Sequence, residues 1–234
     1  MTFTYAGYSD VGKRKNNEDA YNILQEDSLI AVVADGLGGH ANGEVASKIA
    51  ADNITKNAIG CEFDEDELGY TILDAHTDIC ATNSSACTTV AALWISGNNA
   101  IAAHVGDSRI YQFRNNRIIY QSEDHSMVQV AISLGQLPAD ACRHHKDRNK
   151  VYNVLGDEKE RPKIDTQELD VLPGDRFLLC SDGFWEPISE EVMLETVFSF
   201  SSPQAWLNEM REKIQEQNHP KQDNNTAILI LVKD

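Results

Sequence analysis

The sequence predicts an α+β fold in which helices pack against antiparallel sheets. Predicted strands come in groups joined by short turns, predicted helices come in pairs, and strand and helix do not alternate as they do in a parallel sheet. The 234 residues contain no linker-like stretch and no long repeat. We therefore expect residues 1–234 to form a single domain.

The first half of the chain combines strands with one helix pair. Residues 2–9 alternate as a strand does, and Leu29–Ala34 form a continuous apolar run typical of a buried strand. Apolar residues then recur at helical spacing over about 43–59 and about 65–80. Further strands are predicted at Thr88–Ile95, Ala100–Val105, Arg109–Arg114 and Arg117–Gln121. Asn-Asn pairs between these strands favour turns.

The second half adds helices that begin at capping serines. These helices run from Ser126 to Leu134, from Ser189 to Phe198 and from Ser202 to about Gln217. Residues 135–150 are polar, rich in histidine and weakly patterned, which predicts a mobile surface loop. Arg176–Ser181 is a second buried apolar strand, and Thr226–Val232 is the last strand.

Composition excludes several classes of function. The net charge is −17, and such a surface repels nucleic acid. No apolar stretch approaches the ~20 residues that span a bilayer, and the N-terminus lacks the features of a signal peptide, so we expect no membrane partner and a cytoplasmic location. The five cysteines show no CxxC spacing, which favours free thiols over disulfides or a zinc site.

Three acidic sites share one context at the ends of strands. Asp35 and Asp182 each follow a buried apolar strand and precede glycine, and Asp223 comes just before the last strand. A partly desolvated carboxylate is costly unless a cation or hydrogen-bond donors compensate it. Carboxylate and carbonyl oxygens suit Mg²⁺ or Mn²⁺ better than Zn²⁺. The pattern by itself leaves open whether these Asp-Gly pairs mark simple turns or a metal site.

Seven motifs together resemble the PPM/PP2C protein phosphatases, and above all their compact bacterial members. The motifs occur in the order and approximate spacing of that family across essentially the whole chain. They are Arg14-x-x-Asn17-Glu18-Asp19, Asp35-Gly36-x-Gly38-Gly39-His40-x-x-Gly43-Glu44-x-Ala46-Ser47, Thr88-Thr89, Gly106-Asp107-Ser108-Arg109, Asp124-His125-Ser126, Ser181-Asp182-Gly183-x-Trp185 and Asp223-Asn224-x-Thr226. Each motif alone is weak, but seven in order are specific. The resemblance implies an α-β-β-α sandwich of two antiparallel sheets flanked by helix pairs.

The resemblance also implies a binuclear Mn²⁺ or Mg²⁺ centre in a cleft at one end of the sandwich. Asp35 would bridge both metals, the Gly36 carbonyl would bind one, and Asp182 and Asp223 would hold the other. A hydroxide between the two cations would then attack phosphorus in line, without a covalent phosphoenzyme.

Further motif residues receive supporting roles from the same resemblance. Glu18 and Asp19 match an acidic pair that supports the metals directly or through water, and Asp107 matches an aspartate that, with Asp182, can hold a third, weaker metal. Arg14 matches the arginine that grips the substrate phosphate, for which a planar and always charged guanidinium is suited.

The expected activity is hydrolysis of phosphoserine and phosphothreonine on proteins, opposing a Ser/Thr kinase. Two alternatives stay open: an inactive scaffold that binds phosphoproteins, and a phosphatase for one regulatory protein. The general acid is also open, because Leu37 stands where some members place a histidine, and the nearby His40 can instead brace its turn. We expect structural roles for Thr88-Thr89, Asp124-His125-Ser126, Trp185 and Trp206, and solvated side chains for His144 and His145 in a segment that resembles the family's flap.

Overall fold

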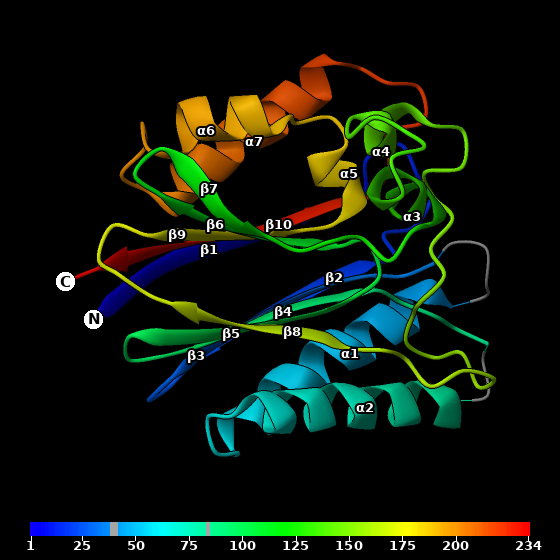
Figure 1. Cartoon of the computed structure of the whole chain (residues 1–234), viewed down its shortest axis with the longest axis horizontal. Coiled ribbons are helices and arrows are strands. Elements are labelled where there is room, and N and C mark those ends of the chain that lie inside the picture. Colours follow the sequence, from blue (N-terminus) through cyan, green and yellow to red (C-terminus); the bar gives the residue numbers. More distant parts are fainter. Residues whose placement is uncertain (38–41, 83–84) are drawn as a thin grey trace.

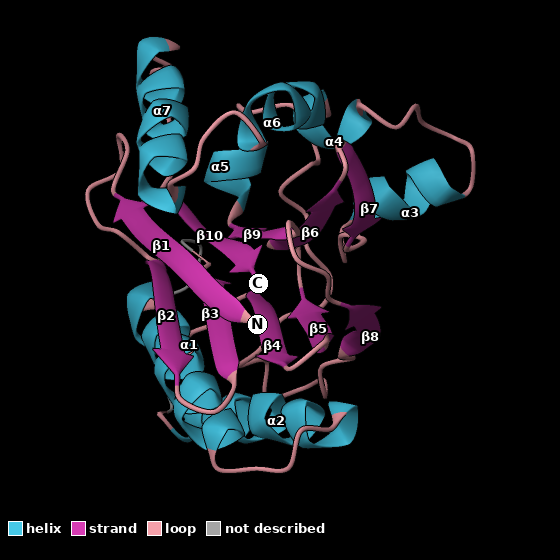
Figure 2. Cartoon of the chain, turned by 90° about the vertical axis from the view of Figure 1, so that its left-hand side faces the viewer, coloured by secondary structure: helices cyan, strands magenta, loops and turns pink. Residues whose placement is uncertain are grey.

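Two antiparallel sheets lie face to face, with helices on both outer faces (Figure 1). The computed structural model describes residues 1–37, 42–82 and 85–234. The strand orders are β1-β10-β9-β6-β7 in one sheet and β2-β3-β4-β5-β8 in the other. In Figure 2 the paired sheets lie between α1 and α2 on one side and α5, α6 and α7 on the other. The α-β-β-α sandwich expected from the sequence is confirmed.

The described elements have the following bounds. The first sheet contains β1 (Thr2–Asp10), β10 (Asn225–Lys233), β9 (Arg176–Cys180), β6 (Arg109–Arg114) and β7 (Arg117–Gln121). The second sheet contains β2 (Asp19–Gln25), β3 (Leu29–Asp35), β4 (Val90–Ser96), β5 (Asn99–Val105) and β8 (Asp165–Asp170). The helices are α1 (Gly43–Ile59), α2 (Glu65–Ala81), α3 (Met127–Ser133), α4 (Ala141–His144), α5 (Asp182–Trp185), α6 (Glu190–Val197) and α7 (Pro203–Glu216).

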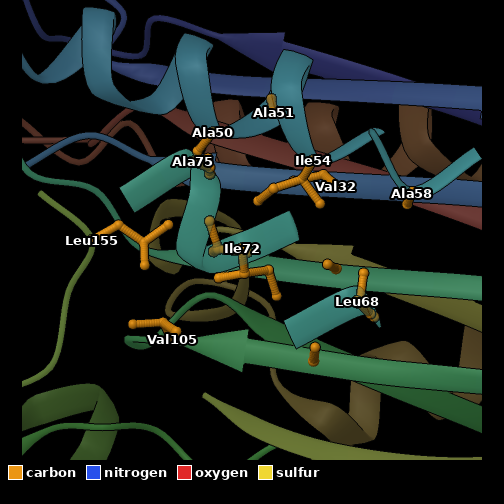
Figure 3. Packing of buried hydrophobic residues seen from close by; sticks show 14 of the residues in the cluster. Val32, Ala50, Ala51, Ile54, Ala58, Leu68, Ile72, Ala75, Val105 and Leu155 are labelled. Atoms are coloured by element: carbon orange, nitrogen blue, oxygen red, sulfur yellow. The ribbon is translucent and has the colours of Figure 1, made fainter. Parts of the chain in front are cut away.

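Burial on both faces explains the continuous apolar runs. Along β3, Ala31 and Val33 belong to the core between the sheets, whereas Ile30 and Val32 pack under α1 and α2. Figure 3 shows this second core, where Ile54 of α1 and Ile72 of α2 lie close to the sheet. Strands with two buried faces need no polar alternation.

Side-chain caps begin the helices that the capping serines predict. The Ser126 hydroxyl accepts a hydrogen bond from the Gln129 amide at 3.1 Å. Ser189 and Ser202 cap α6 and α7 in the same way. Trp185 and Trp206 are buried, and all five cysteines are free, as expected.

Within the described residues, two strands and two short helices were not predicted. The sequences of β2 (DAYNILQ) and β8 (DTQELD) are polar or irregular, and each strand forms an edge of its sheet, where less apolar surface is required. The 135–150 segment is not wholly irregular, since it contains α4. Arg143 and Arg148 of this segment pair with Glu190 and Glu186 at 2.7 Å each. No described helix is long and apolar enough to cross a bilayer.

Candidate active site

The predicted acidic residues converge where strands of both sheets end. Asp35 is the last residue of β3, and Asp19, the first residue of β2, lies opposite it in register. In the other sheet Asp182 follows β9 while Asp223 precedes β10. Antiparallel pairing places the end of one strand beside the start of the next, so both sheets bring carboxylates to the same end. The chain termini lie at the opposite end of the sandwich (Figure 1).

A cleft of about 550 Å³ opens at this end. Its lining contains every predicted site residue except Asp19. The lining residues are Arg14, Glu18, Asp35, Gly36, Leu37, Asp107, Asn149, Lys150, Val151, Asp182, Asp223 and Asn224. Lys150 and its neighbours join the cleft from the 135–150 segment and the bridge that follows it, a placement for which the sequence carries no signal. His144 and His145 do not line the cleft, and His40 lies outside the described residues.

Asp19 lies buried beside the cleft, with one oxygen bonded and the other free. Its Oδ2 accepts a hydrogen bond from the Ser181 hydroxyl at 2.7 Å, and Ser181 Oγ in turn accepts one from the Thr226 amide at 3.0 Å. Asp19 Oδ1 is buried without a partner among the described residues. Burial raises the pKa of Asp19 to about 6. A buried carboxylate oxygen without a donor calls for a proton or a cation.

The carboxylates of the cleft destabilise one another when all are charged. Burial and the nearby Asp19 and Asp182 carboxylates hold the pKa of Asp35 well above its usual range. Burial and the nearby Asp107 and Asp223 carboxylates likewise hold the pKa of Asp182 well above its usual range. Burial and the Asp124 carboxylate raise the pKa of Asp107 to about 7. These oxygen donors fit hard divalent cations such as Mg²⁺ and Mn²⁺, whose charge would relieve the repulsion.

The backbone of Asp35 and Gly36 is held from several sides. Asp35 donates its amide to Thr89 Oγ1 at 3.1 Å and accepts at its carbonyl from Thr88 Oγ1 at 2.9 Å. A Cβ on Gly36 would lie 2.4 Å from the Gly43 carbonyl oxygen, so only glycine fits there. Thr88 and Thr89 therefore position the end of β3, which accounts for both threonines structurally.

Asn224 ties the Arg14 loop to the acidic cluster. Its Oδ1 accepts from the Glu18 amide at 2.9 Å, and its Nδ2 donates to the carbonyls of Val11 and Asn16. Arg14 pairs with Asp223 across the cleft and leaves 52% of its side chain exposed. The guanidinium is thus at the cleft and accessible. Asn224 lies within the Asp-Asn motif, but the sequence did not indicate this bridging role.

A larger cavity of about 750 Å³ lies elsewhere, and both arginines of its lining are paired with carboxylates. There Arg109 binds Asp124 through two bonds of 2.8 Å, and Arg143 binds Glu190 at 2.7 Å. None of the predicted metal ligands lines this cavity. The smaller cleft is therefore the candidate site.

Relatives of the chain are bacterial Ser/Thr phosphatases. The chain is 32% identical to the serine/threonine protein phosphatase PstP of Mycobacterium tuberculosis over 213 residues, which cover 84% of the chain and 39% of PstP. It is 28% identical to the serine/threonine phosphatase stp of Listeria monocytogenes over 94% of the chain and 92% of that protein. The chain therefore spans well under half of PstP but nearly all of stp.

Solved structures and a family model agree with this likeness. The crystal structure of the M. tuberculosis phosphatase PstP/Ppp superimposes with a TM-score of 0.86 at 27% identity, covering 100% of both chains. The catalytic domain of PstP in complex with 2 manganese ions matches with a TM-score of 0.84 at 27% identity, covering 99% of each chain. The sequence model described as "Protein phosphatase 2C" matches residues 6–219. The chain therefore belongs to the protein phosphatase 2C family of Ser/Thr protein phosphatases.

Proposed function

We propose that this chain hydrolyses phosphoserine and phosphothreonine on proteins with the help of two Mn²⁺ or Mg²⁺ ions. The observation that carries the proposal is the cluster of mutually repelling carboxylates at the cleft, one of which has a buried oxygen without a partner. Such a cluster is poorly suited to a scaffold that only binds phosphoproteins, because an anionic site repels phosphate unless cations are present. The manganese-bound PstP domain supports the choice of metal.

The acidic residues of the cleft and the Gly36 carbonyl have proposed roles in holding the cations. Asp35 would contribute to both positions, the Gly36 carbonyl to one of them, and Asp182 and Asp223 to the other. Asp107 with Asp182 offers a third, weaker position, and Glu18 and Asp19 support the cluster from its edge. When bound, the cations would supply the positive charge that lowers the pKa of an attacking water and neutralises the phosphoryl oxygens.

Two positively charged side chains of the cleft, Arg14 and Lys150, would orient the phosphate. Arg14 presents a guanidinium at the cleft that can form paired hydrogen bonds with phosphate oxygens. Lys150, on the opposite segment, adds a second positive charge to the lining and currently pairs with Asp147 at 2.8 Å. We place the substrate phosphate between these two side chains. Proposed partners are phosphorylated proteins modified by a Ser/Thr kinase, in the cytoplasm.

Phosphate release from a phosphothreonine peptide, with Mn²⁺ present, tests the proposed activity. A catalytic chain turns over repeatedly, whereas a scaffold binds the peptide without releasing phosphate. A phosphatase dedicated to one regulatory protein would ignore most unrelated phosphopeptides. Comparing phosphoproteins between cells with and without this gene would then identify substrates. The same assay on residues 1–234 alone tests the prediction of a single catalytic domain.

Arg14→Ala should raise KM for a phosphopeptide about tenfold, because a charge-assisted hydrogen bond contributes about 1.5–3 kcal/mol. The effect on kcat should be smaller, since the guanidinium binds the phosphate in the ground state and the transition state alike. Steady-state kinetics on one peptide measure both constants. Lys15→Ala is the control, because Lys15 is exposed and does not line the cleft. An unchanged KM with a collapsed kcat would contradict the binding role.

Asp107→Asn should stabilise the metal-free protein at pH 8, already do so to a smaller extent at pH 6, and change it little at about pH 4 or below. The pKa of Asp107 is raised to about 7, so between about pH 4 and pH 7 the folded state binds a proton that the unfolded chain has released, and the stability of wild type falls as pH rises across that range. Asparagine mimics the protonated form and avoids that loss. We expect a gain in Tm of at least about 2 °C at pH 8.

Comparing this variant with wild type at each pH is necessary. Burial lowers the pKa of His76 and His125, which makes stability rise with pH over part of the same range. The difference between the two proteins removes that contribution. A destabilised Asp107→Asn protein at pH 8 would show that the Asp107 charge is already compensated by the protein.

A further inference from the structure

His125 forms two hydrogen bonds with the backbone of Gly106, in the loop that carries Asp107. The Gly106 amide donates to His125 Nδ1 at 3.1 Å, and the His125 amide donates to the Gly106 carbonyl at 2.9 Å. Both polar groups of Gly106 are therefore held by one residue. His125 is only 4% exposed, although its sequence context predicts no more than a helix cap. Within this motif the cap of α3 is supplied by Ser126.

The Gly106–Asp107 loop is also held by close packing and by a further hydrogen bond. Gly106 has φ +100°, and a Cβ there would lie 2.6 Å from Thr89 Cγ2. On its other side the Asp107 carbonyl accepts a hydrogen bond from Trp185 Nε1 at 2.9 Å. Asp107 therefore sits between His125 and Trp185, and its carboxylate reaches the cleft beside Asp182.

The hydrogen bonds determine which ring nitrogen of His125 carries the proton. Asn153 Nδ2 approaches His125 Nδ1 at 2.7 Å and also donates to the Lys163 carbonyl at 2.6 Å, while Asn153 Oδ1 accepts from the Lys163 amide. This fixes the amide orientation, so two N–H groups point at Nδ1. The Nδ1 atom must be an acceptor, and the proton of the neutral ring is on Nε2. That Nε2 lies 3.3 Å from Asp165 Oδ2.

The same proton positions argue against a metal at a nearby trio. His104, His125 and Asp165 bring three potential ligand atoms within 4.8 Å of one another. His104 Nε2 faces the Glu123 carbonyl at 2.7 Å and donates to it, which leaves Nδ1 as a free acceptor. His125, however, offers the trio its protonated Nε2. A metal ligand needs a lone pair there, which this ring could supply only as an imidazolate.

We propose that His125 is a positioning residue whose Nδ1 holds the Gly106 amide and thereby keeps the Asp107 carboxylate at the third cation position beside Asp182. This inference rests on the proposed function for Asp107 itself. Burial and the stacked His104 lower the pKa of His125, which keeps the ring neutral and Nδ1 free to accept. Support from outside the immediate ligands commonly changes metal affinity 10–100-fold.

A matched pair of substitutions separates this role from simple packing. His125→Asn places an amide oxygen near the original Nδ1 and can still accept from Gly106, whereas His125→Gln places its polar atoms near Nε2. Both variants replace a buried ring by a buried amide. Titration calorimetry with Mn²⁺ should show weak-site affinity reduced about tenfold in the Gln variant and within about threefold of wild type in the Asn variant.

Asp107→Asn and wild type are measured in parallel. If wild type has no weak Mn²⁺ site that Asp107→Asn removes, the proposed role of Asp107 fails. If that site exists but the Gln variant binds as wild type does, or both variants lose affinity equally, the role of His125 Nδ1 is wrong. Should the Gln variant not fold, Asn153→Asp replaces it, because a carboxylate facing Nδ1 favours the proton on that nitrogen and so prevents Nδ1 from accepting the Gly106 amide. Unchanged weak-site affinity in Asn153→Asp would then overturn the proposal.

Discussion

Asp35→Asn and Asp182→Asn are each expected to lower kcat at least about a thousandfold. Each change removes one charge from the carboxylates that would hold the cations, and it leaves the strand ends in place. Asp35 contacts the cleft from the end of β3 and Asp182 from the start of α5, just after β9, so the two variants weaken the cluster from different sheets. Steady-state kinetics at saturating Mn²⁺ and phosphopeptide measure the effect.

Asp27→Asn provides the matched control for these variants. Asp27 is exposed in the turn between β2 and β3, away from the cleft lining, so the same chemical change there should leave kcat near the wild-type value. Circular dichroism should show that all three variants are folded. More than about a tenth of wild-type kcat in either site variant would be incompatible with the assigned role.

Removal of divalent cations should abolish activity, and added Mn²⁺ or Mg²⁺ should restore it. The uncatalysed hydrolysis of phosphate monoesters is extremely slow, so strong stabilisation by positive charge is needed to promote it. A cleft lined mainly by carboxylates can obtain that charge from bound divalent cations. Arg14 already pairs with Asp223, which leaves the remaining carboxylates without a comparable partner in the cleft lining. Phosphate release after dialysis against EDTA, followed by metal addition, measures the effect.

Two controls make the metal experiment decisive. EDTA that has been saturated with Mg²⁺ beforehand should not inhibit, which excludes a direct effect of the chelator. Melting curves should show that the stripped protein stays folded. Full activity in the stripped protein would reject the cation mechanism, and a folded, metal-loaded protein that binds phosphopeptide without releasing phosphate would favour the scaffold.

Much of the fold was predictable because its strongest signals are local. The apolar run of β3 and the helical spacing in α1 and α2 depend only on which faces are buried, and the capping serines of α3, α6 and α7 act within one turn. The edge strands β2 and β8 were missed because their sequences, DAYNILQ and DTQELD, carry no regular alternation of apolar and polar residues.

The sequence by itself determined the family, the α+β class and the acidic residues at strand ends, because these depend on short motifs and on their order. Only the tertiary structure decided that Asp19 lies opposite Asp35 with one buried oxygen unpartnered, and that Lys150 reaches the cleft. The tertiary structure alone showed that His125 accepts a hydrogen bond from the Gly106 amide and that Asn224 accepts one from the Glu18 amide. The physical reason is that hydrogen bonds and charge repulsion act over a few ångströms, between residues that the fold brings together from distant parts of the chain.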